Sequence, residues 1–194
     1  MTTKKIVTLN DAEIINTKGI AALVMDAQPR LLASIKRSES LVQTLEIYAE
    51  TMKILGVPVI LTEQVPSKLG NTVEVISQHE SVTFSKNSFS AFGDSLFCKW
   101  VEQNEISHML LGGIETSICI YLTAMEARRR NIEVTILSDC VSGRRKKDGE
   151  YAMNELMNAG VHMLGLETIL YSLLRSSEHA AFKDITNLIR GRIT

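Results

Sequence analysis

Short runs of consecutive apolar residues alternate along the chain with longer stretches in which apolar residues recur every three or four positions. The runs are typical of strands covered on both faces, and the longer stretches are typical of helices with one buried face. We predict strands at 20–25, 57–61, 82–84, 108–111, 132–137 and 161–164. We predict helices at about 38–55, 72–79, 94–103, 146–158, 167–174 and 178–189, and a further helix that begins near 117.

The helix near 117 follows a strand and the glycine pair Gly112–Gly113. Thr116 or Ser117 is the expected N-cap, because either hydroxyl can accept a hydrogen bond from an amide of the first turn. Apolar residues then recur with helical spacing, which predicts a buried face made of Ile118, Leu122 and Met125.

Strands and helices alternate throughout, which predicts an α/β fold with a parallel sheet covered on both faces. Right-handed crossovers then give a three-layer α/β/α sandwich, and we expect six strands in the order 3-2-1-4-5-6. The chain has 194 residues and shows no repeat, linker or low-complexity segment. We therefore expect one domain that spans 1–194.

Composition narrows the class of protein. Hydrophobic residues make up 45% of the chain and the formal net charge is −1, so nothing favours nucleic acid or an anionic membrane as a partner. Segment 1–18 has no apolar signal-peptide core, and no apolar run approaches the roughly 20 residues of a membrane helix. Three cysteines without metal-type spacing fit a reducing compartment. We expect a cytoplasmic protein, with the basic runs 128–130 and 144–147 at solvated helix ends.

In sheets of this kind the site lies beyond the carboxyl ends of the strands. Three reactive residue types fall there: Asp26 after the first strand, Lys86 after the third, and Cys119 in the turn after the fourth. Asp26 can accept the thiol proton, and Lys86 favours the charged forms of both partners. A thiol in the first turn of a helix also meets unpaired amides, so we expect Cys119 to be more acidic than a free cysteine.

Each of these residues also has a plainer interpretation. Asp26 can cap a short turn, Lys86 can be a solvated loop charge, and Cys119 can be a small core residue, as most intracellular cysteines are. The residues alone leave both interpretations open.

Several motifs together resemble the isochorismatase-like cysteine hydrolase superfamily, over about 20–189. They are Val24-Met-Asp-Ala-Gln28, Pro58-Val-Ile-Leu-Thr-Glu-Gln64, Phe84-Ser-Lys86 with Phe89-Ser-Ala-Phe92, and Gly113-Ile-Glu-Thr-Ser-Ile-Cys119 with Ser138-Asp139. The segments 62–70 and 112–116 are most similar to the branch of isochorismatase domain-containing proteins.

This resemblance implies a catalytic triad of Asp26, Lys86 and Cys119. It also implies a cis peptide bond between Ile114 and Glu115, in a turn whose amides, with that of Cys119, bind the oxyanion. Other candidates for substrate binding are Gln28, Glu63 with its neighbour Gln64, Phe89 and Phe92 as an apolar lid, and Ser117.

Departures from the wider family refine the expected reaction. The nicotinamidase branch binds a metal through an Asp and two His residues after the second strand, whereas 62–79 contains no Asp and only His79. We therefore expect no catalytic metal, and no nucleotide-binding motif indicates another cofactor. The cysteine favours hydrolysis of a small amide or related carbonyl compound over vinyl-ether cleavage.

The resemblance further implies a homo-oligomer that acts on a small molecule. Ser117 stands where the branch often has His, which leaves a second hypothesis: a non-catalytic or redox-responsive oligomeric scaffold.

Overall fold

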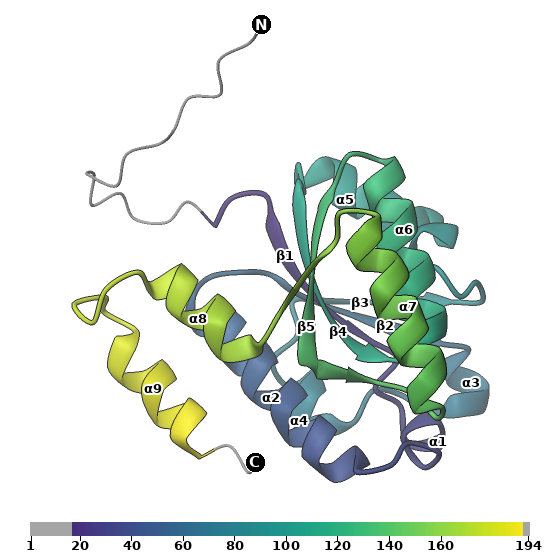
Figure 1. The fold of residues 1–194 in the computed structure, drawn as a ribbon, viewed down its shortest axis with the longest axis horizontal. Helices are drawn as coiled ribbons and strands as arrows, with labels where there is room; N and C mark the ends of the chain where they lie inside the picture. Colours follow the sequence, from purple (N-terminus) through teal and green to yellow (C-terminus); the bar gives the residue numbers. More distant parts are fainter. Residues whose placement is uncertain (1–16, 192–194) are drawn as a thin grey trace, which may run out of the picture.

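A parallel sheet forms the centre of the protein, seen in a computed structural model that describes residues 17–191 (Figure 1). The described strands run in the order β3-β2-β1-β4-β5-β6, so the predicted α/β class and strand order are confirmed. The strands are β1 (Ile20–Met25), β2 (Val59–Gln64), β3 (Val82–Lys86), β4 (His108–Ile114), β5 (Glu133–Ser142) and β6 (His162–Leu164).

Helices cover both faces of the sheet, and successive residues of β1 point to opposite layers. Ala22 and Val24 pack in the core beneath α2, α8 and α9, whereas Ala21, Leu23 and Met25 pack beneath α5, α6 and α7 (Figure 1). The helical elements are α1 (Pro29–Leu32), α2 (Ser38–Ile54), α3 (Pro66–Leu69), α4 (Glu74–Ser77), the 3-10 turn η1 (Ala91–Gly93), α5 (Ser95–Gln103), the π-helical turn η2 (Thr116–Ile120), α6 (Tyr121–Arg129), α7 (Lys146–Asn158), α8 (Leu166–Leu174) and α9 (Phe182–Arg190).

Several strands run further toward the candidate site than the apolar runs predict. Thr62, Glu63 and Gln64 belong to β2 rather than to a loop, because they pair with Phe84, Ser85 and Lys86 of β3. Hydrogen bonds to the neighbouring strand hold these polar residues extended, and this support is invisible in the local pattern. The pairing places Gln64 directly beside Lys86.

The predicted buried face of the helix near 117 is wrong at Leu122, whereas Ile118 and Met125 pack, partly buried, against the core. Leu122 is 41% exposed, and the buried residues of α6 are Thr123, Ala124 and Ala127. The π-helical turn explains the shift, because the Ile120 amide donates to the Glu115 carbonyl five residues earlier and the extra residue rotates the helix that follows. The Glu115 backbone also takes the N-cap position, without the predicted side-chain cap from Thr116 or Ser117.

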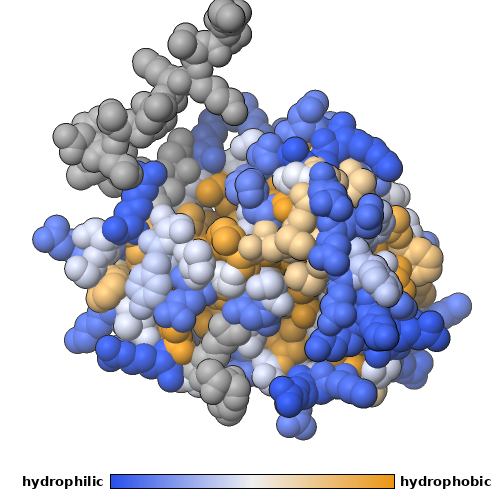
Figure 2. Space-filling model, in the orientation of Figure 1, coloured by the Kyte–Doolittle hydropathy of each residue, from blue (hydrophilic) through white to orange (hydrophobic). Residues whose placement is uncertain are grey.

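At the ends of the chain, α9 begins at Phe182, later than the predicted 178. Segment 1–18 lies almost wholly outside the described residues, and one domain across 1–194 stays a prediction. None of the helices described between Pro29 and Arg190 is long and apolar enough to cross a membrane. In the space-filling view, hydrophobic surface lies mainly in the middle of this face and hydrophilic side chains surround it (Figure 2).

Candidate active site

Asp26 lies directly after β1 and is fully buried. Its backbone has a φ of 55°, a left-handed conformation that Asp adopts more readily than most residues. The Asp26 amide donates to the Thr62 carbonyl at 2.9 Å, and the Thr62 hydroxyl donates to Oδ1 at 2.8 Å. The carboxylate is therefore held on its β2 side, and its second oxygen is available to other partners.

Lys86 ends β3 and reaches across β2 to that second oxygen. Its Nζ lies 2.8 Å from Asp26 Oδ2, and the two side chains are 1% and 0% exposed. Only one strand separates β3 from β1, a distance of about 10 Å that a lysine side chain can cross. The ammonium also donates to Gln64 Oε1 at 2.7 Å.

Cys119 lies in η2, beyond the end of β4, and is 8% exposed. The Lys86 ammonium lies 3.8 Å from its Sγ, and the thiol is hydrogen-bonded to Asp26. The Glu115 backbone contributes a further hydrogen bond at the sulfur. The peptide bond between Ile114 and Glu115 is cis, as the resemblance implies. The structure thus brings Asp26, Lys86 and Cys119 into mutual contact.

The pKa of Cys119 contradicts the expected acidic thiol. Burial, together with the negative charge of Asp26, raises it from 9.0 to about 12, although Lys86 opposes the shift. Burial also raises the pKa of Asp26 above its usual 3.8, against the opposing effect of Lys86. Placing a thiolate beside a carboxylate in a buried site costs more than the helix terminus contributes. The resting site therefore holds a neutral Cys119 thiol beside the ion pair of Asp26 and Lys86.

This arrangement predicts an unusual alkaline profile for alkylation of Cys119 by iodoacetamide. Since the pKa is about 12, the thiolate fraction and the rate should rise about tenfold per pH unit from pH 9 to 11. Peptide mass spectrometry after brief labelling resolves Cys119 from Cys98 and Cys140. The urea-unfolded chain is the control, because its cysteines should level off near their ordinary pKa. A plateau near pH 9 in the folded protein would contradict the raised pKa.

A cavity of about 310 Å³ opens beside the thiol. Its walls are mainly apolar and include Asp26, Cys119 and a single cationic residue, Arg144. The Arg144 Nε lies 2.8 Å from Glu115 Oε1, and this contact raises the pKa of Arg144, so the guanidinium remains charged. The lining residues are Asp26, Leu31, Ser34, Gln64, Leu69, Phe89, Ile114, Glu115, Ile118, Cys119 and Arg144.

Four of the predicted substrate-binding residues do not line this cavity. Gln28 is fully buried and hydrogen-bonds the backbone of Gln64. Glu63 is buried and accepts a hydrogen bond from the Thr72 amide. Their polar groups serve the local backbone, a use that sequence pattern cannot separate from ligand binding.

The remaining two candidates, Phe92 and Ser117, also lie away from the cavity wall. Phe92 is 5% exposed, packs edge-on against Phe97 and carries the Arg130 guanidinium over its ring. Phe89 does line the cavity and is 57% exposed, so of the two phenylalanines proposed as a lid only this one is placed for it.

Sequence reasoning missed part of the cavity wall, including Leu31, Leu69 and Arg144. Arg144 belongs to a basic run predicted to be solvated, because the predicted strand ends at 137 whereas β5 continues to Ser142, two residues before Arg144. Leu31 and Leu69 come from α1 and α3, single-turn helices too short to show a periodic pattern. Cys140 packs in the core beneath α2, on the opposite face of the sheet from Cys119.

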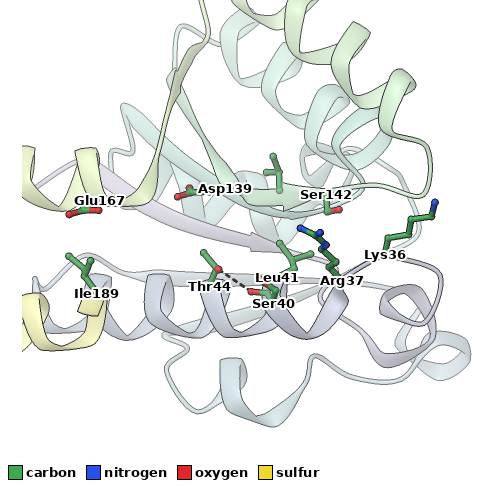
Figure 3. Close-up of a pocket in the computed structure, with 10 residues that line it drawn as sticks. Lys36, Arg37, Ser40, Leu41, Thr44, Asp139, Ser142, Glu167 and Ile189 are labelled. Atoms are coloured by element: carbon green, nitrogen blue, oxygen red, sulfur yellow. Dashed lines mark hydrogen bonds between the residues drawn. The ribbon is translucent and has the colours of Figure 1, made fainter. Parts of the chain in front are cut away.

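A larger cavity of about 500 Å³ lies elsewhere, between α2 and the end of β5 (Figure 3). Lys36 and Arg37 lie toward one end, and Asp139 and Glu167 toward the other (Figure 3). It contains none of the triad residues, so size does not identify the reactive site. Within residues 17–191, no group of three or more His, Cys, Asp or Glu side chains is arranged to hold a metal ion.

A model of the isochorismatase domain matches residues 21–168. The chain belongs to the isochorismatase family. Isochorismatase domain-containing protein 2 from Danio rerio is 31% identical over 175 residues, which cover 90% of this chain and 89% of the relative. Members of the isochorismatase family are hydrolases.

Two solved structures of similar fold extend the comparison. MAR1 ribonuclease from Caenorhabditis elegans superposes with a TM-score of 0.86 and 26% identity, covering 94% of this chain and 95% of that chain. The YcaC gene product from Escherichia coli, described as an octameric hydrolase of unknown specificity, has a TM-score of 0.81 and 18% identity, with 97% of both chains covered. The second likeness concerns the fold alone.

Proposed function

We propose that this isochorismatase-family protein is a metal-independent cysteine hydrolase of small amides or related carbonyl compounds. Cys119 is the nucleophile, Asp26 the general base and Lys86 their electrostatic partner. One observation carries the proposal: a carboxylate and a thiol at the wall of one cavity both contact the buried ammonium of Lys86, and the three groups come from separate segments. The two carboxylates of that wall, Asp26 and Glu115, are each paired with a cation of the chain, which supports a reaction without a metal.

The raised pKa of the thiol indicates how the reaction begins. As Cys119 Sγ bonds to the substrate carbonyl carbon, its proton passes to the Asp26 carboxylate, and the carbonyl oxygen becomes an oxyanion. Amides of the turn 115–119 are the proposed donors to that oxyanion. The carbon–nitrogen bond then breaks, and Asp26 returns the proton to the leaving amine.

Water completes the cycle. Asp26 takes a proton from a water molecule as it attacks the Cys119 thioester, and the thiolate that leaves takes up that proton. The products are a carboxylic acid and a regenerated thiol. Lys86 stays an ammonium throughout, so it offsets the charge of Asp26 whenever the carboxylate is ionised.

The cavity also limits the kind of substrate that can bind. Its volume suits a small molecule, and Phe89, Ile114 and Ile118 offer an apolar surface to its body. Arg144 is the one basic side chain of this wall, and Glu115 occupies its Nε. The remaining guanidinium N–H groups can bind a carboxylate on the substrate, since Arg recognises planar anions with paired hydrogen bonds.

Replacing Arg144 should therefore change selectivity rather than chemistry. For Arg144→Gln we expect kcat/KM to fall about tenfold for an amide that carries a terminal carboxylate, the size of one charge-assisted hydrogen bond at a partly exposed position. The neutral amide of equal length should be hydrolysed at an unchanged rate. Arg145→Gln is the matched control, because Arg145 does not line this cavity. Equal losses for both amides would contradict anion recognition by Arg144.

A panel of small amides tests the proposed function. Ammonia release is followed for each compound, and samples quenched in acid are analysed by intact and peptide mass spectrometry for an acyl group on Cys119. A Cys98→Ser variant should react like the parent chain, because Cys98 does not line the cavity. The scaffold hypothesis predicts neither turnover nor acylation across the panel, and that outcome would overturn the proposal.

The relatives suggest two further checks. RNA belongs in the panel because one similar structure is named a ribonuclease, although a cavity of about 310 Å³ with a mainly apolar wall favours a small substrate. Self-association, supported by the octameric likeness, is measured by light scattering at low protein concentration. A cytoplasmic location stays a prediction.

A further inference from the structure

Gln64 lies between two hydrogen-bonded groups at the edge of the cavity. Its Oε1 accepts from the Lys86 ammonium at 2.7 Å, and its Nε2 donates to the Asn87 carbonyl at 2.8 Å. The two bonds fix the orientation of the amide, because only the oxygen can accept from an ammonium. Gln64 therefore presents an acceptor to Lys86 from a direction that Asp26 does not occupy.

A buried ammonium has three protons that need acceptors. Asp26 and Gln64 take two of them with short bonds of 2.8 and 2.7 Å. The third is left to the Ser88 carbonyl at 3.4 Å and the Cys119 sulfur at 3.8 Å. With two protons anchored, the third is directed toward the side of the ammonium where the Ser88 carbonyl and the Cys119 thiol lie. The neutral side-chain amide of Gln64 anchors one of these protons without adding a second negative charge beside Asp26.

Gln28 in turn holds Gln64 in place. The Gln28 Oε1 accepts from the Gln64 amide at 2.8 Å, and its Nε2 donates to the Gln64 carbonyl at 3.1 Å. The last residue pair between β1 and β2 is Met25 with Thr62. Beyond that pair, the Gln28 side-chain amide makes the two hydrogen bonds to Gln64 that the backbone of a neighbouring strand would make. Gln28 is 0% exposed and does not line the cavity, and its Nε2 also donates to the Gly70 carbonyl, so its contacts serve the local backbone, including that of Gln64, rather than a ligand.

We propose that Gln64 is a positioning residue, which holds the Lys86 ammonium between Asp26 and Cys119 and is itself fixed by Gln28. The inference rests on the proposed function, because it assigns Lys86 a role in the reaction of the thiol. The charged and titratable groups nearby are Asp26, Lys86 and Cys119, with Glu115 and Arg144 on the same cavity wall and Glu63 bonded to the Thr72 amide.

The test is the rate at which iodoacetamide alkylates Cys119 between pH 4.5 and 8, resolved by peptide mass spectrometry. Gln64→Leu removes the acceptor, so Lys86 loses its orientation and the rate at pH 7 should fall about tenfold, the effect of one lost hydrogen bond to a charged group. Gln28→Met should lower the rate in the same direction but less. Gln103→Leu, at the exposed end of α5, should leave it unchanged.

Gln64→Glu gives a readout that a purely structural role would not move. The variant keeps the acceptor and its length but places a second carboxylate on the same ammonium. The pair of carboxylates should then retain a proton to higher pH. Because a protonated Asp26 cannot accept the thiol proton, the pH below which the alkylation rate falls should rise by about one pH unit or more. Being nearly isosteric, this variant tests the proposal even if Gln64→Leu fails to fold.

Three outcomes separate the hypotheses. A slower Gln64→Leu and a shifted Gln64→Glu support the positioning role. Parent-like rates and profiles in both variants would overturn it while leaving the proposed hydrolase intact. If Asp26→Asn also alkylates with the parent rate and profile, Asp26 does not assist the thiol, and the proposed function fails together with this inference.

Discussion

Replacing Cys119 by alanine is expected to abolish amide hydrolysis, with a loss in kcat of at least about 10⁴-fold. The proposed reaction proceeds through a sulfur–carbon bond, and no other described residue at the cavity wall offers a thiol. The change removes one small side chain that is 8% exposed, so the fold should persist. Ammonia release from the best amide of the panel, with circular dichroism of the variant, measures both.

Cys140→Ala is the matched control for this variant. Cys140 is fully buried but packs on the other face of the sheet, so its loss should affect stability and leave kcat close to that of the parent chain. Activity that survives in Cys119→Ala, or that disappears equally in Cys140→Ala, would contradict a specific nucleophile at position 119.

Replacing Lys86 by methionine should remove both activity and much of the stability. The change leaves the Asp26 carboxylate buried without its cation, and breaking such a pair from one side typically costs about 3–5 kcal/mol in the free energy of unfolding. The site can lessen the cost by keeping a proton on Asp26, but a protonated Asp26 cannot accept the thiol proton. Urea unfolding followed by circular dichroism measures the loss.

The double variant Asp26→Asn with Lys86→Met separates charge from packing. The asparagine side chain introduced in place of Asp26 would keep the acceptor for the Thr62 hydroxyl and carry no charge, so most of the lost stability should return while activity stays absent. If the double variant is as unstable as Lys86→Met alone, the destabilisation comes from packing around the lysine stem rather than from an unpaired carboxylate.

The fold and the meeting of the triad could be predicted because they depend on simple regularities. Apolar runs separated by amphipathic stretches imply a parallel sheet, and its carboxyl ends gather whatever follows each strand. Asp26, Lys86 and Cys119 each follow such a run closely. Their convergence could therefore be predicted mainly from the order of the strands.

The errors arise where a residue's use depends on neighbours distant in the sequence. The face of α6 was misplaced because a π-helical turn changes the phase of the helix, and no local spacing announces that turn. The acidity of Cys119 was misjudged because burial outweighs the helix terminus. Gln28 was taken for a ligand-binding residue because the backbone that it holds, at Gln64, lies 36 positions away.

Gly113 allows the backbones of β1 and β4 to approach closely just before the residues of the candidate site. Its φ is 114°, and a Cβ at this position would lie 2.1 Å from the Met25 carbonyl oxygen and 2.5 Å from the Met25 nitrogen. The backbones of β1 and β4 therefore touch one residue before Asp26 and six before Cys119. A side chain at position 113 would force the two strands apart, so the absence of a Cβ there helps to set the distance between the Asp26 carboxylate and the Cys119 sulfur.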